Sequence, residues 1–249
     1  LGVAHGRQAR EGSRLVVDIG GGSTELILGQ GEKPHALESL HMGCVSLTER
    51  FFPDGEITPR NFEKARTAAR LELLGVALLR QGRHEEALDR LREALDREPG
   101  RASAWNSAGE ALGLIGRVRP ALDAFLRAVQ CDPELVAAHC NLGLALARLG
   151  RHEEAIVALE RALRLDGRLD RALFALGRSL QTLGRYGEAG RCYARLAELR
   201  PEDPVVHNAL GSVVQLQGDY GRARRCYERA LALAPRFADA HSNLGSAWQ

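Results

Sequence analysis

The sequence predicts a mostly α-helical chain, a solenoid of stacked helix pairs that follows a small α/β segment. Three observations support this class. Glycine returns at intervals of 34 residues, apolar residues inside each interval are spaced three, four and seven apart, and the pattern before residue 68 is extended rather than helical. A stack of small repeated units builds a long surface and no enclosed chamber, so this class favours binding over catalysis.

The glycine that defines the period stands in the first helix expected in each unit. Inside a helix, glycine costs about 1 kcal/mol relative to alanine, so six occurrences in register need a common cause. We expect close approach of two helix backbones to be that cause. The six positions are Gly75, Gly109, Gly143, Gly177, Gly211 and Gly245. A second glycine stands where each first helix should stop, at Gly82, Gly116, Gly150, Gly184 and Gly218.

Other positions repeat with the same period. Alanine stands twelve residues after the first five glycines, at Ala87, Ala121, Ala155, Ala189 and Ala223. A bulky apolar residue follows four positions later, at Leu91, Phe125, Leu159, Tyr193 and Tyr227. Proline closes four of the units, at Pro99, Pro133, Pro201 and Pro235. Over residues 68–249 this pattern resembles the tetratricopeptide repeat family, with five complete repeats and the first helix of a sixth. The resemblance implies a right-handed superhelix of helix pairs whose first helices line a concave face.

That resemblance also indicates which side chains face the groove, because positions two, five, nine and twelve of each repeat point into it. We expect a peptide-binding groove formed by Asn106, Glu110, Asn141, Arg171, Phe174, Arg178, Gln181, Asn208 and Gln215. Arg171 and Arg178 lie seven residues apart on one helix face and flank Phe174, which makes them the sharpest local hypothesis. The alternative is a pair of solvated arginines around a packing aromatic ring. The N-L-G strings at Asn141 and Asn243 resemble the asparagine-lined groove of O-linked N-acetylglucosamine transferases, which implies contacts to a peptide backbone.

The first 67 residues have a different pattern. Residues 14–19 and 24–28 read as two strands joined by a glycine turn, and a third strand is expected near residues 36–41. A short helix is expected over residues 45–52. Thr58 is a good helix N-cap and Pro59 a good first residue. The helix that they open should run over residues 60–81 and join this segment to the first repeat.

The glycine turn, DIGGGST, allows two interpretations. A P-loop is excluded because the string has no lysine and leads into a strand. Consecutive N–H groups of a glycine turn form a nest for anions, whereas a plain glycine hairpin is the alternative. The longer string LVVDIGGGSTELILG, followed by SLHMGCVSLTERFFPDGEIT, resembles the exopolyphosphatase/guanosine pentaphosphatase family, which has the actin-like ATPase fold. The resemblance implies a phosphate loop formed by Gly20, Gly21, Gly22, Ser23 and Thr24. It also implies that Asp18 and Glu25 lie around a magnesium ion or an attacking water.

Much of that family's machinery is missing from this sequence. Its first phosphate loop lies in an N-terminal domain that the chain lacks. By the same resemblance, the catalytic glutamate lies in an acidic stretch just before the point at which this sequence begins. We therefore assign no catalytic residue, expect no phosphatase activity, and expect Mg²⁺ only if the phosphatase interpretation holds. The expected division is residues 1–67 for the partial α/β segment and residues 68–249 for the solenoid. A natural fusion, a frameshift and an assembly error remain open as origins of the join, and a chimeric product without a function of its own remains an alternative.

Composition limits the partners. The chain has 249 residues and a net charge of +2, so we expect no nucleic-acid or membrane partner. The five cysteines form no C-x-x-C pair, which indicates buried small apolar residues in a reducing cytoplasm. His139, His207 and His241 share one repeat position and are expected to pack there like aromatic rings. We expect the chain to be part of a larger gene product, and self-association through Leu244 and Trp248 of the half repeat.

Overall fold

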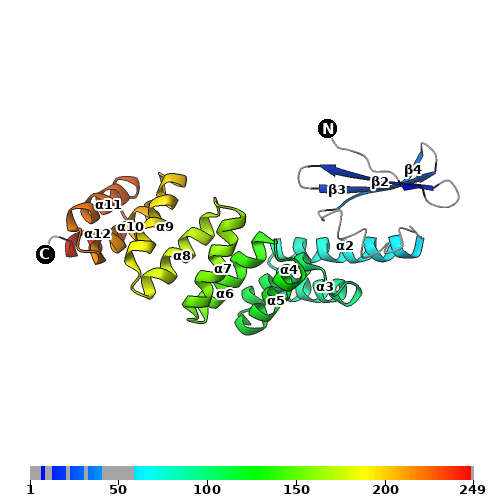
Figure 1. Ribbon diagram of the computed structural model, residues 1–249, viewed down its shortest axis with the longest axis horizontal. Coiled ribbons are helices and arrows are strands. Elements are labelled where there is room, and N and C mark those ends of the chain that lie inside the picture. The colour runs from blue at the N-terminus through cyan, green and yellow to red at the C-terminus, as the bar shows by residue number, and fades with distance from the viewer. Residues whose placement is uncertain (1–6, 9–12, 21–22, 31–32, 41–58, 248–249) are drawn as a thin grey trace. The chain divides into compact units, whose positions relative to one another are not determined.

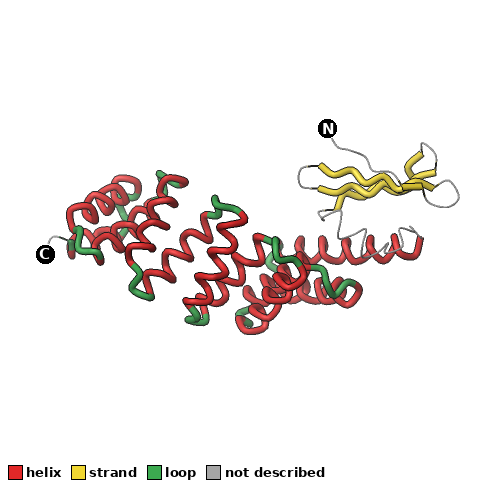
Figure 2. Tube along the Cα trace, viewed as in Figure 1, coloured by secondary structure: helices red, strands yellow, loops and turns green. Residues whose placement is uncertain are grey.

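The computed structural model describes residues 7–8, 13–20, 23–30, 33–40 and 59–247, and the side chains from residue 63 onward with the exception of Ala65. Figure 1 shows the helices and strands of the described residues, and Figure 2 separates them by type. The chain divides into two compact units, Leu1–Pro99 and Gly100–Gln249. Several predictions fall outside the described residues: the helix over 45–52, the cap at Thr58, and Gly21, Gly22, Cys44 and Trp248.

The first unit begins with an antiparallel sheet in the order β1-β2-β3-β4. Its strands are β1 Arg7–Gln8, β2 Ser13–Gly20, β3 Ser23–Gln30 and β4 Lys33–Leu40. The three predicted strands are confirmed, each within a few residues of the expected bounds. The register of β2 and β3 pairs Asp18 with Glu25 and ends with Gly20 opposite Ser23.

Two helices complete the first unit, α2 Pro59–Arg80 and α3 His84–Arg97. The continuous helix predicted over residues 60–81 is confirmed to within one residue at each end. Because α2 passes through residues 67 and 68 without a break, the proposed division between the α/β segment and the solenoid stays a prediction. Gly75 is the contact point of the pair, since a Cβ there would lie 2.7 Å from Leu91 Cγ.

Every regular element among the described residues of the second unit is an α-helix. Its helices are α4 Ala102–Leu114, α5 Val118–Cys131, α6 Val136–Arg148, α7 His152–Leu165, α8 Asp170–Thr182, α9 Tyr186–Leu199, α10 Pro204–Leu216, α11 Tyr220–Leu233 and α12 Ala238–Ser246. Each of the helices α4, α6, α8 and α10 packs against the helix that follows it. In addition α6 packs against α4 and α8, and α10 against α12 (Figure 1). The unit is therefore a solenoid whose first helices form a layer. The layer is packed from α4 to α8, and Gln181 and Ser212 link α8 to α10.

The periodic glycine makes room mainly for the bulky side chain of the following helix, whereas we predicted close approach of two helix backbones. A Cβ at Gly143 would lie 2.5 Å from Leu159 Cγ, and one at Gly109 would lie 2.5 Å from Phe125 Cε1. Carbon atoms do not approach this closely without moving apart, so only glycine fits. Gly245 is the exception: a Cβ there would meet nothing within 4 Å.

The second glycine of each repeat ends the first helix in a left-handed conformation. The φ angles are +77° at Gly82, +88° at Gly116, +75° at Gly150, +73° at Gly184 and +85° at Gly218. Any other L-residue is strained there, which is why glycine recurs at this helix end.

The cysteines and histidines only partly follow the expectations. Cys140 is buried, and burial raises the pKa of its thiol. Cys131 is exposed, so the expectation of burial is wrong for it; it is the last residue of α5 and faces solvent.

The histidines do more than pack. The Nε2 atoms lie 2.9 Å from Pro133 O at His139, 2.8 Å from Pro201 O at His207 and 2.9 Å from Pro235 O at His241. Each ring thus ties a first helix to the carbonyl of the proline that closes the preceding repeat.

Candidate functional site

Side-chain hydrogen bonds tie α4 to α6 across the layer of first helices. The Nδ2 group of Asn141 donates to Asn106 Oδ1 at 3.0 Å and to Glu110 Oε1 at 2.7 Å. Asn106 Nδ2 also lies 3.3 Å from the same Glu110 oxygen. Both hydrogens of the Asn141 amide are therefore used within the protein, and its carbonyl oxygen is left for another partner.

A second set of bonds ties α8 to α10 and α10 to α12. Gln181 Nε2 lies 3.4 Å from Ser212 Oγ, and Gln215 Nε2 lies 3.4 Å from Ser246 Oγ. Asn243 Nδ2 donates to Asn208 Oδ1 at 3.0 Å. These bonds join residues 31 or 35 apart, so the repeat period sets their geometry.

Buried tyrosines support the two glutamines from the second helices. Tyr227 donates its hydroxyl to Gln215 Oε1 at 2.7 Å, and Tyr193 OH lies 3.5 Å from Gln181 Oε1. Burial raises the pKa of Tyr227 to about 12 and moves that of Tyr193 up further. Both hydroxyls therefore stay protonated to a higher pH than the hydroxyl of a free tyrosine does.

The step between α6 and α8 differs from its neighbours. Every residue of these two helices is described, and no side chain of one hydrogen-bonds to a side chain of the other. Leu144 and Arg148 of α6 lie there with Arg171 and Arg178 of α8 around open space. Among the steps from α4 to α12, this is therefore the one at which no side-chain hydrogen bond joins the first helices. We call it the open step for that reason, although α6 and α8 pack against each other.

The first hollow, here called the Phe174 hollow, lies mainly between α8 and the ends of α9 and α10, and it reaches α6 at Leu144. Its volume is about 390 Å³. It is lined by Leu144, Asp170, Arg171, Phe174, Ala175, Arg178, Leu196, Arg200, Asp203, Val205 and Val206. Phe174 is half-buried and meets Tyr193 edge to face, with ring centroids 5.7 Å apart and an interplanar angle of 60°. At the rim Arg200 is ion-paired with Asp170 and lies 3.8 Å from an oxygen of Asp203.

The second hollow, here called the Glu110 hollow, has a volume of about 610 Å³ and continues the first. The two share Leu144, Arg171 and Arg178. The remaining lining residues are Gly109, Glu110, Gly113, Leu114, Val118, Ala121, Phe125, Asn141, Ala145 and Arg148. We call the two hollows together the inner groove.

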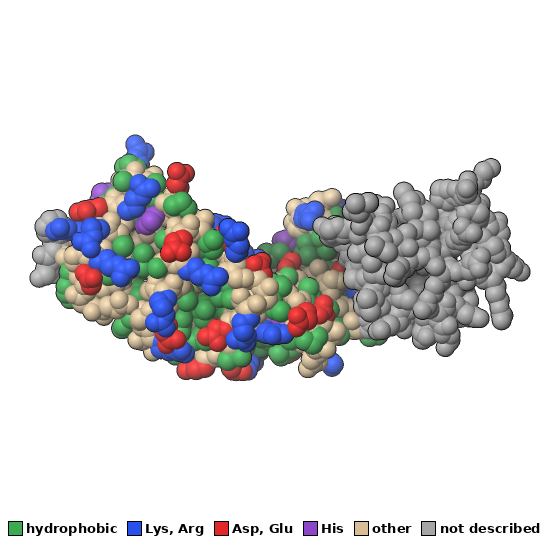
Figure 3. Space-filling view, turned by 45° about the horizontal axis from the view of Figure 1, so that its top comes forward, with side chains coloured by type: hydrophobic (Ala, Val, Ile, Leu, Met, Phe, Trp, Pro, Cys, Tyr) green, Lys and Arg blue, Asp and Glu red, His purple; other side chains and the backbone are tan. Residues whose placement is uncertain are grey.

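The inner groove carries excess positive charge. Arg148, Arg171 and Arg178 are exposed, and none of the three is ion-paired with a described residue. Glu110 is the only acidic residue that lines the Glu110 hollow, and its carboxylate already accepts from Asn141. Figure 3 shows one face of the molecule, on which basic, acidic and apolar side chains are intermixed.

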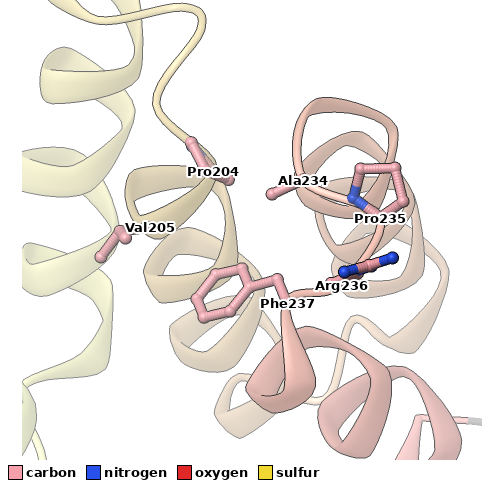
Figure 4. Close-up of a pocket in the computed structure, with 6 residues that line it drawn as sticks. All are labelled: Pro204, Val205, Ala234, Pro235, Arg236 and Phe237. Carbon is pink, nitrogen blue, oxygen red and sulfur yellow. The ribbon is translucent and has the colours of Figure 1, made fainter.

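A third hollow lies where α10 begins and where α11 joins α12. Its volume is about 570 Å³, and it is lined by Pro204, Val205, Ala234, Pro235, Arg236 and Phe237. In Figure 4 the ring of Phe237 points toward the N-terminal end of α10. With a single charged residue in its wall, this hollow offers few groups for specific recognition.

Most of the predicted groove residues come together. Glu110, Asn141, Arg171 and Arg178 line the Glu110 hollow, Phe174 lines its neighbour, and Asn106 bonds to two of them. The other three, Gln181, Asn208 and Gln215, make the bonds between helices described above.

Sequence reasoning missed Arg148 and the charged rim of Asp170, Arg200 and Asp203. A signal for Arg148 existed, because it follows Leu144 by four residues and so continues the same helix face. The rim residues lie at helix ends. The rule that assigns positions two, five, nine and twelve of each repeat to the groove makes no prediction for them.

The predicted phosphate loop is described through its strands alone. Asp18 and Gly20 belong to β2, and Ser23, Thr24 and Glu25 to β3. Its role stays a prediction. In the part of the chain with described side chains, no group of three His, Cys, Asp or Glu residues is arranged to hold a metal ion. Among the described helices, none is long and apolar enough to span a membrane.

Comparison with protein families divides the chain in two. Residues 1–91 match the Ppx/GppA phosphatase family. Residues 72–135, 136–168 and 168–236 match tetratricopeptide repeat families. The two kinds of match overlap over the end of α2 and the start of α3, where the continuous helix joins them.

Individual relatives follow the same division. A Haemophilus influenzae protein described as an exopolyphosphatase is 49% identical over 83 residues, which is 32% of this chain and 25% of that protein. A guanosine-5'-triphosphate,3'-diphosphate pyrophosphatase of Vibrio vulnificus is 53% identical over 75 residues, 30% of this chain and 15% of that enzyme. The chain thus spans a quarter or less of these curated relatives. Among solved structures, YrrB, described as a repeat protein with an unusual peptide-binding site, matches with a TM-score of 0.64 and 23% identity over 70% of this chain and 90% of YrrB. At that identity the likeness shows the fold alone.

Proposed function

Because residues 72–236 belong to the tetratricopeptide repeat family and the N-terminal segment to the Ppx/GppA phosphatase family, we propose that the chain is a non-enzymatic scaffold that binds a peptide segment of another protein. The peptide lies along the inner groove. The observation that carries this proposal is the open α6/α8 step, where neighbouring first helices leave side chains without internal partners.

The chemistry of the groove fits an extended peptide. Phe174 and Leu144 offer apolar surface to a side chain, and Arg171 and Arg178 offer donors to carboxylate or carbonyl oxygens. Asn141 keeps its carbonyl oxygen for a peptide N–H. The remaining predicted groove residues, Gln181, Asn208 and Gln215, extend the same wall toward α12. The partner is a protein rather than a nucleic acid or a membrane, and a reducing cytoplasm suits the free cysteines.

A displayed library of random peptides, selected on the full chain, tests this function. We expect enriched peptides whose binding is lost in Phe174→Ala and weakened in Arg171→Glu. Val157→Ala is the matched control, because Val157 is 64% exposed on the second helix α7 and lines none of the three hollows. Enriched peptides that bind the Phe174→Ala variant as tightly as the native chain would contradict binding in the inner groove.

The Ppx/GppA match supports a second candidate, a polyphosphate or guanosine pentaphosphate phosphohydrolase that uses the Gly20–Thr24 turn. The strand register pairs Asp18 with Glu25 beside that turn, where the family resemblance places a magnesium ion or a water. Phosphate release from either substrate with Mg²⁺, abolished by Asp18→Asn, would favour this candidate. Release no faster than in the Asp18→Asn variant would eliminate it.

A further inference from the structure

We infer that the segment bound at Phe174 is acidic: an apolar side chain enters the Phe174 hollow while neighbouring carboxylates pair with Arg148, Arg171 and Arg178. This inference rests on the proposed function and names the chemistry of its partner. The observation behind it is the set of three arginines at the step which, among those described from α4 to α12, has no side-chain hydrogen bond between first helices.

Two arginines elsewhere in this unit have the carboxylate partners that the three in the groove lack. Arg151 and Arg185, which precede α7 and α9, lie 2.6 Å and 2.7 Å from carboxylate oxygens of Glu154 and Glu188. A guanidinium stays charged at any physiological pH and binds a carboxylate with two parallel hydrogen bonds. No described carboxylate pairs with the guanidinium groups of Arg148, Arg171 and Arg178. All three line the Glu110 hollow.

The acidic residues of the groove, by contrast, are already engaged. Glu110 accepts hydrogen bonds from Asn141 and Asn106, and Asp170 is ion-paired with Arg200. Asp203 accepts from the Val205 N–H at the start of α10. A basic peptide would therefore meet satisfied carboxylates and unpaired guanidinium groups, which repel it.

The apolar residues that line the groove favour an acidic peptide over other polyanions. Phe174, Ala175, Leu196 and Val206 all line the Phe174 hollow, and Phe174 packs against the buried cluster that contains Leu196 and Val206. An aliphatic side chain gains free energy by covering such a surface. A nucleic acid strand would need a longer basic track, and the chain carries 34 basic against 32 acidic residues. The groove thus favours a peptide with an apolar residue among aspartates or glutamates.

Fluorescence anisotropy with three labelled peptides tests the inference on the full chain. In the first a leucine lies between aspartates; in the second and third asparagine and lysine replace the aspartates. We expect the aspartate peptide to bind at least about tenfold more tightly than the asparagine peptide, with an affinity that falls as salt rises. Arg171→Gln with Arg178→Gln should remove most of that difference, and Arg171→Glu with Arg178→Glu should reverse the preference toward lysine.

The matched control changes the same charges outside the groove. Arg127 and Arg191 are exposed on the second helices α5 and α9, and neither lines a hollow. Arg127→Gln with Arg191→Gln should leave the ranking of the three peptides unchanged. A control variant that loses the aspartate preference as fully as the groove variant would overturn the inference, because general charge would then explain it.

The remaining outcomes separate this inference from the function on which it rests. Three peptides bound equally, all lost in Phe174→Ala, would overturn the acidic preference and leave peptide binding intact. No binding by any of the three would count against both. A single-stranded oligonucleotide that competes through Arg171 and Arg178 as well as the aspartate peptide would also overturn the inference.

Discussion

The α6/α8 and α10/α12 steps are built on the same helical frame but have opposite inner walls. In α10 the fifth and twelfth repeat positions are Asn208 and Gln215, and each reaches a polar residue of α12. In α6 the same positions are Cys140 and Ala147, and the facing positions of α8 are Ala175 and Arg178. None of these combinations makes the bond between helices, so the α6/α8 step stays open.

The comparison of the two steps distinguishes two kinds of residue in a repeat sequence, those that follow the period and those that break it. Periodic residues such as Gly143 and Gly211 fix the spacing of the helices, and they are the same at both steps. Residues that break the period decide whether neighbouring helices satisfy each other or leave groups for a partner. We therefore expect substitutions of inner-wall residues to change stability at the closed step and binding at the open one.

The largest expected effect appears at high pH and comes from Tyr227, whose buried ring lies on α11 at the closed step. The pKa of Tyr227 is raised from about 10 to about 12, so the ring ionises in the unfolded chain first. Stability is complete below pH 10 and falls as pH rises to about 12, by about 2–3 kcal/mol. Urea unfolding at pH 9 and pH 12 should show a smaller loss in Tyr227→Phe than in the native chain. An equal loss in both would contradict the assignment.

The next largest effect compares two periodic glycines. Gly143→Ala places a Cβ 2.5 Å from Leu159 Cγ and should cost about 1–3 kcal/mol of unfolding free energy. Gly245→Ala, which meets nothing within 4 Å, should be neutral or stabilising by up to about 1 kcal/mol. Thermal melts of both variants measure the difference. A Gly143→Ala chain that melts with the native chain would refute the close-packing explanation.

A third prediction compares inner-wall residues of the two steps. Gln215→Ala leaves the buried Tyr227 hydroxyl without its acceptor and should cost about 1–2 kcal/mol. Arg178→Ala, at the open step, should change stability by less than about 0.5 kcal/mol. Combining Gln215→Ala with Tyr227→Phe should recover part of the loss, because the stranded hydroxyl is gone. If the Arg178 variant were the less stable of the two, the comparison of the steps would be wrong.

The smallest effect concerns Ser179 of α8. Its hydroxyl is buried, with 1% of the residue exposed, and has no hydrogen-bond partner. The equivalent residues of α4 and α6 are Ala111 and Ala145. Ser179→Ala should therefore raise the free energy of unfolding, by up to about 1 kcal/mol. A destabilised variant in chemical denaturation would indicate an unrecognised partner for the hydroxyl.

The sequence was sufficient for the fold because the fold depends on positions that repeat. Gly109 and Gly150 each have one steric role that returns in every unit, so a period of 34 residues reveals both roles. The groove was only partly predictable. The position of each residue in its helix was enough to identify Arg171, Phe174 and Arg178. The hydrogen bond between Asn106 and Asn141 was not predictable in this way, because it depends on the residues of two repeats. The lack of such a bond at Cys140 depends on two repeats for the same reason. Arg200 and Asp203 escaped notice because they lie in the connections between helices.

Photo-cross-linking tests most directly whether the open α6/α8 step is the binding site. A photoreactive phenylalanine analogue at Phe174, and separately at Val157 on α7, is irradiated with a labelled peptide from the library selection. The account predicts strong cross-linking from position 174 and background from position 157. Cross-linking from 157 that equals or exceeds that from 174 would contradict it.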